Sequence, residues 1–428
     1  MLRSSFILIL GRVLGAAFGL ISGIFLARIL GAEKLGQYQI FLSTQTILIT
    51  LVTLGIGNAS IYFINKGKIS EKEIVSSFLK ILAIIAAISC LCFYFVINKN
   101  TGYFGSIDSI SFLLFLLGTA SLIIISVLRP ILYARQKVLQ VTFTNLLPSF
   151  ILIIGVLGLV LWNKLDVSNA LSIWGIGNFL ALLFSLFFHR HYISLSQKIN
   201  IKNVSEITFY GVKLSASNLL FILIGNTSVF FIKMLSVEGF SDVGLYSRAI
   251  AISSIVYMIP TAVGPLLFSR WSSSMVKNEY ELEIQKTLRI FNTISFVIIL
   301  LGSVFSSLII YALYGEEYLS IQKTLIILLF SLIFQVMSEV FNNYLASQGK
   351  AILTMYSLLA SFLVIVIGNI ILVPLYGING SAIAVLLSSI TNSMILYLMV
   401  RRSIDIKLVN ILIINRSDVL FLKQKIKL

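Results

Sequence analysis

The sequence predicts an all-α integral membrane protein, with 12 transmembrane helices in two pseudo-symmetric six-helix lobes around a central cavity. Three observations support this fold class. The 428 residues are 58% apolar and 11% charged, with a mean hydropathy of +1.02, whereas a soluble domain is about 45–50% apolar and about 25% charged. The chain contains a series of long apolar stretches, and two of its motifs recur half a chain later.

The apolar stretches have the length of membrane-spanning helices. A hydrocarbon core about 30 Å thick requires about 20 apolar residues per helix, because each backbone polar group must be satisfied within the segment. The charge-free run Ala351–Val400 is too long for one span, and Pro374 and Gly377 divide it into two. The predicted helices are 6–30, 37–64, 74–97, 110–134, 139–162, 168–189, 209–235, 243–268, 287–314, 321–346, 351–374 and 378–400.

The positive charges indicate the orientation of these helices. If the N-terminus is cytoplasmic, 24 of the 32 Lys and Arg residues lie at cytoplasmic loops and helix ends, 7 lie on the other side, and Arg12 lies within the first span. The positive-inside rule therefore places both termini in the cytoplasm. The net charge of +16, which in a soluble chain would indicate nucleic acid, is explained by topology, so we expect no nucleic-acid partner.

Two motifs recur at nearly the same spacing. Gly36-Gln-Tyr38 resembles Gly244-Leu-Tyr246 at an offset of 208 residues, and Ala134-Arg-Gln136 resembles Ala346-Ser-Gln348 at an offset of 212. Such self-similarity indicates a six-plus-six duplication, in which both halves have the same orientation in the membrane. We therefore expect an N-terminal lobe at 1–200, a C-terminal lobe at 201–403 and a cytoplasmic interfacial tail at 404–428.

Short glycine-based pieces of the chain resemble the polysaccharide flippases. These are the O-antigen and capsule repeat-unit flippases of the polysaccharide transporter branch of the multidrug/oligosaccharidyl-lipid/polysaccharide (MOP) exporter superfamily. The pieces are Gly11-Arg12-x-x-Gly15, Phe18-Gly19, Ala27-Arg28-Ile-Leu-Gly31-x-x-x-x-Gly36-x-Tyr38, Leu54-Gly55-Ile-Gly57-Asn58-Ala59, Tyr210-Gly211 and Gly244-x-Tyr246-x-x-Ala249.

This resemblance implies a fold like that of the MATE transporters and a transport function. The cargo would be undecaprenyl-diphosphate-linked oligosaccharide, moved by alternating access from the cytoplasmic to the outer leaflet of a bacterial inner or plasma membrane. The expected partners are this lipid-linked oligosaccharide, the bilayer, H⁺ or Na⁺, and polysaccharide polymerase or assembly proteins. Flipping a lipid requires no bond chemistry, so we expect no catalytic residue, no cofactor and no metal.

Arg12 is the first candidate for binding the cargo. An ionisable group at membrane depth is costly and therefore indicates function, and the guanidinium fork matches phosphate oxygens. The alternative is that Arg12 extends to the cytoplasmic interface. A stripe of small residues beside it would permit close approach of another helix; its members are Gly11, Gly15, Gly19 and Gly23.

Four further cations lie on the two predicted inner helices and the start of the next one. Arg28 and Lys233 end spans 1 and 7, Lys213 opens span 7, and Arg248 lies a short way into span 8. We expect them to extend the cationic cavity of Arg12 for a diphosphate or an anionic sugar. Anchoring at the membrane interface is the alternative for each of them.

Glu339 is the one carboxylate well inside a predicted span, with Asn343 one helical turn further along. A carboxylate with an amide can take up a proton or hold Na⁺, which predicts an ion-coupling site. The alternative is an intramembrane ion pair with Arg129, which lies near the equivalent position in the first half. Pro148 and Pro260 lie within spans 5 and 8 and are predicted kinks, suited to act as hinges.

Two other functions compete with that of a flippase. A cation-coupled multidrug exporter of the same superfamily would place a carboxylate in span 1, but that span carries Arg12 and Arg28 and no acid before Glu33. A membrane polysaccharide polymerase or ligase requires a large outer loop, and the predicted outer connections are short. The sequence therefore favours an anionic cargo and transport.

Overall fold

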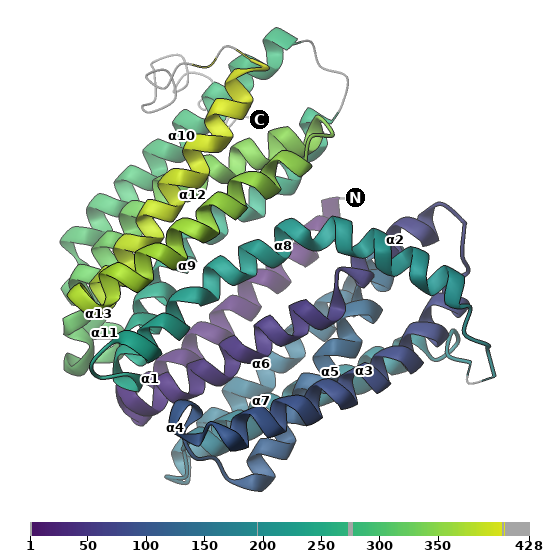
Figure 1. Cartoon of the computed structure of the whole chain (residues 1–428), viewed down its shortest axis with the longest axis horizontal. Helices are drawn as coiled ribbons and strands as arrows, with labels where there is room; N and C mark the ends of the chain where they lie inside the picture. The colour runs from purple at the N-terminus through teal and green to yellow at the C-terminus, as the bar shows by residue number, and fades with distance from the viewer. Residues whose placement is uncertain (1, 195, 273–276, 405, 407–428) are drawn as a thin grey trace. The chain divides into compact units, whose positions relative to one another are not determined.

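The computed structural model describes residues 2–194, 196–272, 277–404 and 406 (Figure 1). Every regular element of this described part is a helix. The elements are α1 (Leu2–Thr53), α2 (Ile56–Asn65), α3 (Glu71–Lys99), α4 (Thr101–Phe104), α5 (Ser109–Ala134), α6 (Val138–Leu161), α7 (Val167–His189), α8 (Ile201–Leu235), α9 (Phe240–Trp271), α10 (Lys277–Val304), α11 (Ser306–Tyr314), the 3₁₀ helix η1 (Glu316–Ile321), α12 (Gln322–Ser347) and α13 (Ile352–Arg401).

All twelve predicted spans lie in helices. Nine helices of the described part are long and apolar enough to cross a membrane. Two of these, Leu10–Asn65 and Ile352–Arg401, each cover most or all of two predicted spans, and the predicted span 243–268 lies within α9. The predicted tail 404–428 lies outside the described residues, except for Ile404 and Ile406.

Two glycines with left-handed backbone divide the longest helices. Gly31 in α1 has φ = 73° and Gly377 in α13 has φ = 57°, a conformation that other residues adopt only at a cost. The halves of α13 then lie side by side, because Ser388 Oγ donates a hydrogen bond of 2.9 Å to the carbonyl of Ser361. Figure 1 shows the same reversal at the turn of α1.

Two predicted spans are interrupted within the membrane-spanning length. Leu54 and Gly55 both have positive φ and separate α1 from α2, inside the predicted span 37–64. Phe305 separates α10 from α11, inside the predicted span 287–314. Hydropathy does not reveal either break, because the residues at both are apolar or small.

The chain divides into two compact units, Met1–Ile222 (unit 1) and Leu223–Leu428 (unit 2). The division falls inside α8, whereas the sequence placed the boundary at 200. The first part of α8, up to Ile222, belongs to unit 1, where the ring of Tyr210 stacks on Tyr62 at 4.7 Å. A Cβ on Gly211 would lie 2.8 Å from the carbonyl oxygen of Leu54, so only glycine permits this approach.

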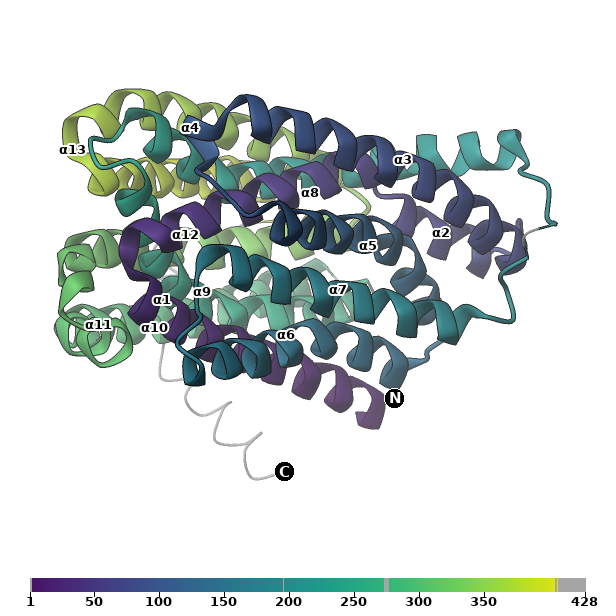
Figure 2. The same ribbon diagram turned by 90° about the horizontal axis from the view of Figure 1, so that it is seen from below.

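Unit 1 is built around α5, which lies between α3 and α7 (Figure 2). The α6 helix packs against α7 and against the first half of α1. A buried cluster that includes Phe78, Ile123 and Ile131 packs around the second half of α5. Nearer the start of α5, the ring of Phe41 contacts Phe115 edge-on at 5.7 Å. The α5 helix is therefore packed along much of its length, which fixes the positions of its polar side chains.

Unit 2 repeats a contact of unit 1. Gly57 of α2 packs directly on the Ser126 carbonyl of α5. In unit 2, a Cβ on Gly264 of α9 would lie 2.8 Å from the Oε1 atom of Glu339 on α12. The two glycines are 207 residues apart and their partners 213 residues apart, close to the offsets of the sequence motifs. The motif tyrosines Tyr38 and Tyr246 are both buried, which also supports a duplication.

Candidate functional site

A cavity of about 230 Å³ opens beside Arg12 in unit 1. It lies between the first half of α1, α5 and α6, and Arg12, an exposed residue, is part of its lining. Hydroxyl and amide side chains form its polar wall, and no carboxylate lines it in the described part of the chain. Its residues are Leu8, Gly11, Arg12, Gly15, Tyr133, Thr142, Asn145 and Ser149.

Glycine packing explains how α1 approaches this cavity. A Cβ on Gly11 would overlap the methyl group of Thr142, so α1 and α6 meet there with no room for a side chain. A Cβ on Gly15 would make ordinary contact with Leu146 at 3.5 Å, and one on Gly19 would meet no atom within 4 Å. Gly23 is half-buried. The α1 and α6 helices thus approach closely at Gly11, whereas α1 is open at Gly19, and the packing role of the whole stripe stays a prediction.

Among the described residues of unit 1, the other two predicted cations, Arg28 and Lys213, are not lining residues of the Arg12 cavity. Arg28 is exposed at the far end of the first half of α1, about 24 Å from Arg12 along the helix at 1.5 Å per residue. Lys213 is exposed, with its Nζ atom 4.2 Å from the ring of Phe209. It lies well inside α8, because that helix begins at Ile201 and not at the predicted 209. Of the three predicted cargo-binding cations in unit 1, Arg12 is therefore the one that lines this cavity.

The two predicted cargo-binding cations of unit 2, Lys233 and Arg248, contact aromatic rings. The Nζ atom of Lys233 lies 3.3 Å from the centre of the Phe240 ring. The guanidinium of Arg248 lies 5.8 Å from the ring of Tyr314, and its Nε donates to Ser247 at 3.3 Å. A cation–π contact stabilises the cation through the quadrupole of the ring, which carries no net charge of its own. The role of both residues in cargo binding stays a prediction.

Glu339 forms a polar cluster in unit 2. Its Oε1 accepts a hydrogen bond of 2.9 Å from the amide of Asn343, and its Oε2 accepts one of 3.3 Å from the hydroxyl of Tyr257. Gly264 lies directly against the carboxylate, since a Cβ there would lie within 3 Å of both Glu339 and Asn343. The cluster joins α9 to α12. The sequence missed Tyr257, which lies 82 residues away, although it is on the same helical face as Gly264.

Arg129 lines a second cavity in unit 1 and donates from Nη2 to the carbonyl of Thr144 at 3.4 Å. This contact lies within unit 1, whereas the hydrogen bonds of Glu339 lie within unit 2. The predicted pair of these two residues stays a prediction. Pro148 and Pro260 lie inside α6 and α9, each of which runs on as one helix, and their hinge role also stays a prediction.

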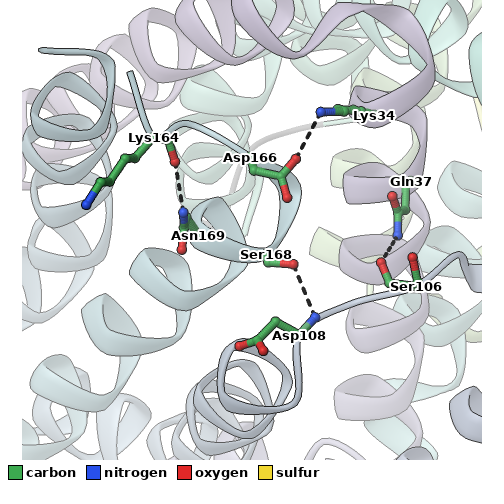
Figure 3. A network of polar contacts seen from close by, with 8 residues as sticks. All are labelled: Lys34, Gln37, Ser106, Asp108, Lys164, Asp166, Ser168 and Asn169. Carbon is green, nitrogen blue, oxygen red and sulfur yellow. Dashed lines mark hydrogen bonds and ion pairs between the residues drawn. The ribbon is translucent and has the colours of Figure 1, made fainter. Parts of the chain in front are cut away.

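At the end of unit 1 away from Arg12, polar contacts connect the helix ends and turns (Figure 3). Lys34 pairs with Asp166 at 3.2 Å, and the amide of Gln37 donates to the carbonyl of Ser106 at 2.9 Å. Asp108 caps α5 by accepting from the backbone N–H groups of Ile110 and Ser111, each at 3.2 Å. These contacts join the turn of α1 to the starts of α5 and α7.

Solved structures share this arrangement of helices. One is the inward-facing conformation of a multidrug resistance MATE family transporter of the MOP superfamily, with a TM-score of 0.73 and 15% identity, covering 91% of this chain and 94% of that one. Another is the lipid II flippase MurJ in an inward closed conformation, with a TM-score of 0.72 and 15% identity, covering 94% and 88%. The chain thus has the MOP transporter fold, and the predicted fold class is confirmed.

Sequence comparison gives the family. The family model described as polysaccharide biosynthesis protein matches residues 1–271, so the chain belongs to that family. A protein of Shigella flexneri named "Putative O-antigen transporter" is 22% identical over 236 residues, which span 54% of this chain and 56% of that relative. The match thus covers about half the length of the curated relative. The family resemblance and the multi-pass membrane character predicted from the sequence are confirmed.

Proposed function

We propose that this protein is a flippase for undecaprenyl-diphosphate-linked oligosaccharide repeat units. It moves them by alternating access from the cytoplasmic to the outer leaflet of a bacterial inner or plasma membrane, with both termini in the cytoplasm. The observation that carries the proposal is the Arg12 cavity, whose lining combines an arginine with hydroxyl and amide side chains. The family match and the MOP fold support the same class of cargo.

The chemistry of the cavity suits a diphosphate head group. A guanidinium presents several N–H donors in a plane and binds two phosphate oxygens at once. Thr142, Asn145 and Ser149 add hydroxyl and amide groups that can hydrogen-bond to phosphate or to sugar. The cavity is too small for a whole lipid-linked oligosaccharide, so Arg12 binds the head group while the sugars and the lipid lie elsewhere.

The same features disfavour a multidrug exporter that binds cationic drugs. Such cargo requires carboxylates to compensate its charge, and the described residues that line the Arg12 cavity include none. The first half of α1, up to Gly31, also contains no acid. The two multidrug resistance MATE family transporters among the structural neighbours share 14–15% identity with this chain, which bears on the fold alone.

Ion coupling at Glu339 would supply the driving force. The carboxylate is half-buried and already accepts hydrogen bonds from Asn343 and Tyr257. Proton uptake, or Na⁺ held by the carboxylate and the amide oxygen, would change the contacts between α9 and α12. Polysaccharide polymerase or assembly proteins would then take up the cargo at the outer leaflet.

Deleting the gene from its bacterium tests the cargo class. We expect surface polysaccharide to be lost and lipid-linked repeat units to accumulate with their sugars facing the cytoplasm. Wild-type protein restores surface polysaccharide, whereas the Arg12→Ala variant, present at the same level in the membrane, does not. Unchanged polysaccharide in the deletion strain, with altered sensitivity to cationic drugs, would contradict the proposal.

A further inference from the structure

A second cavity of unit 1 has no role in the proposed cargo binding. It has a volume of about 380 Å³ and lies between the second half of α1, α5 and α7. It shares no lining residue with the Arg12 cavity among the residues that the structure describes. Its polar wall consists of Gln45, Thr46, Thr50, Ser126, Arg129 and Trp174.

Arg129 is the charged group of this cavity, and part of its guanidinium lacks a partner. The Nε atom is buried with no hydrogen-bond partner among the described residues. The Nη2 atom makes one long contact, 3.4 Å to the carbonyl of Thr144. Because arginine does not deprotonate in proteins, this is a permanent positive charge inside a membrane-spanning helix. Such a charge is costly unless it is compensated.

The carboxylates of unit 1 are placed elsewhere and do not line this cavity. Glu71 pairs with Arg135, and Asp166 pairs with Lys34. Of the remaining four, two accept hydrogen bonds at helix ends: Glu73 from Asn203, and Asp108 from the first backbone N–H groups of α5. The other two, Glu33 and Glu206, are exposed. The described carboxylates of unit 1 therefore leave the charge of Arg129 uncompensated, and a bound anion would compensate it.

We propose that the Arg129 cavity binds a small inorganic anion, of which chloride is the abundant example. The guanidinium, the amide of buried Gln45 and the indole of Trp174 offer N–H donors along the wall. The hydroxyls of Thr46, Thr50 and Ser126 now donate to carbonyls of their own helices and can rotate toward an anion. The volume accommodates an ion with several waters.

Trp174 makes this anion site measurable by fluorescence. Iodide quenches indole fluorescence on contact, and the chain has three tryptophans. Trp271 is fully buried and Trp162 is 75% exposed, so a Trp162→Phe background leaves Trp174 as the side chain that iodide reaches through the cavity. The full-length protein in detergent is titrated with potassium iodide at constant ionic strength, with gluconate as the balancing anion.

We expect quenching that saturates and that chloride, but not gluconate, reverses. In Arg129→Gln the half-saturating concentration rises by about tenfold or more, because a charge-assisted hydrogen bond is lost. The matched control Arg12→Gln leaves it unchanged. Chloride should also raise the unfolding temperature of the wild type and not that of Arg129→Gln, which is a readout independent of Trp174.

Three results would overturn the proposal. The first is linear, non-saturating quenching of the wild type by iodide. The second is quenching that still saturates, at the wild-type concentration, in Arg129→Gln. The third is saturating quenching that appears only in Glu339→Gln. The last would mean that Glu339 neutralises Arg129 in the resting protein. Normal circular dichroism of each variant, measured alongside, ensures that a lost signal reflects the site and not misfolding.

Discussion

The hydroxyl of Tyr257 on α9 donates a hydrogen bond to Oε2 of Glu339 on α12, 3.3 Å away. The Asn343 amide, one helical turn beyond Glu339, donates to the other carboxylate oxygen at 2.9 Å. A carboxylate held from two helices can transmit its own change of charge to their packing. This is the physical basis for expecting ion coupling at Glu339.

Glu339→Gln tests that expectation. The amide cannot exchange a proton or supply a negative charge to Na⁺, so we expect transport driven by an ion gradient to fall at least tenfold while transport down a cargo gradient persists. The measurement is cargo movement in vesicles with an imposed pH or Na⁺ gradient. Tyr257→Phe removes one hydrogen bond and keeps the charge, so it should retain gradient-driven transport. Wild-type transport that is indifferent to both gradients would rule out this role.

Arg12 should be required for polysaccharide assembly in cells. Arg12→Ala removes the guanidinium from a cavity with no other charged lining residue in the described part of the chain, so we expect surface polysaccharide to fall by about tenfold or more. Arg12→Lys keeps the charge without the planar fork and should be intermediate. Lys164→Ala, which changes an exposed cation at the other end of unit 1, serves as the control. Normal surface polysaccharide in Arg12→Ala would exclude Arg12 from the mechanism.

Two glycines should respond oppositely to the same small change. A Cβ on Gly175 of α7 would overlap the carbonyl of Leu114 on α5, whereas one on Gly19 would meet nothing within 4 Å. We expect Gly175→Ala to lower the free energy of unfolding by about 1–3 kcal/mol. Gly19→Ala should be neutral or slightly stabilising, since alanine favours the helix. Thermal unfolding in detergent compares them, and equal effects would show that α5 and α7 do not meet at Gly175.

The Lys34–Asp166 pair should add little stability. The two side chains are 58% and 49% exposed, and solvent-exposed pairs contribute about 0–1 kcal/mol. A double-mutant cycle with alanine at both positions should therefore give a coupling energy within that range. Asp108→Ala should cost about 1 kcal/mol or more, because it removes the cap of α5. A coupling energy of several kcal/mol for Lys34 and Asp166 would show that the network of Figure 3 holds the unit more firmly than exposure indicates.

The helices were predictable from the sequence because the bilayer imposes the same requirement on every membrane-spanning segment. Each span must be long and apolar, so hydropathy alone located all twelve in helices. The start of α8 was missed by eight residues, because Ile201–Thr208 is mostly polar and lies before the apolar stretch. A cap signal was present at Asn200, whose Oδ1 accepts from the N–H of Asn203 at 3.4 Å.

The side-chain sites were only partly predictable. Asn343 and Glu339 share one helix, so their spacing places them within reach of each other, and the hydrogen bond exists. Tyr257, by contrast, comes from a different helix, and no local pattern gives the register between α9 and α12. The same holds for Thr144, which contacts Arg129 from α6, and for Thr142, which packs on Gly11.

Movement of the cargo across a bilayer is the most direct test of the central claim. Purified protein is reconstituted into vesicles with an undecaprenyl-diphosphate-linked oligosaccharide placed in one leaflet, and an enzyme outside the vesicles reports the sugars that become accessible. We predict rapid exposure with the wild type, none in protein-free vesicles, and a large loss with Arg12→Gln. Exposure equal to that of protein-free vesicles, from wild-type protein that is correctly folded, would contradict the account.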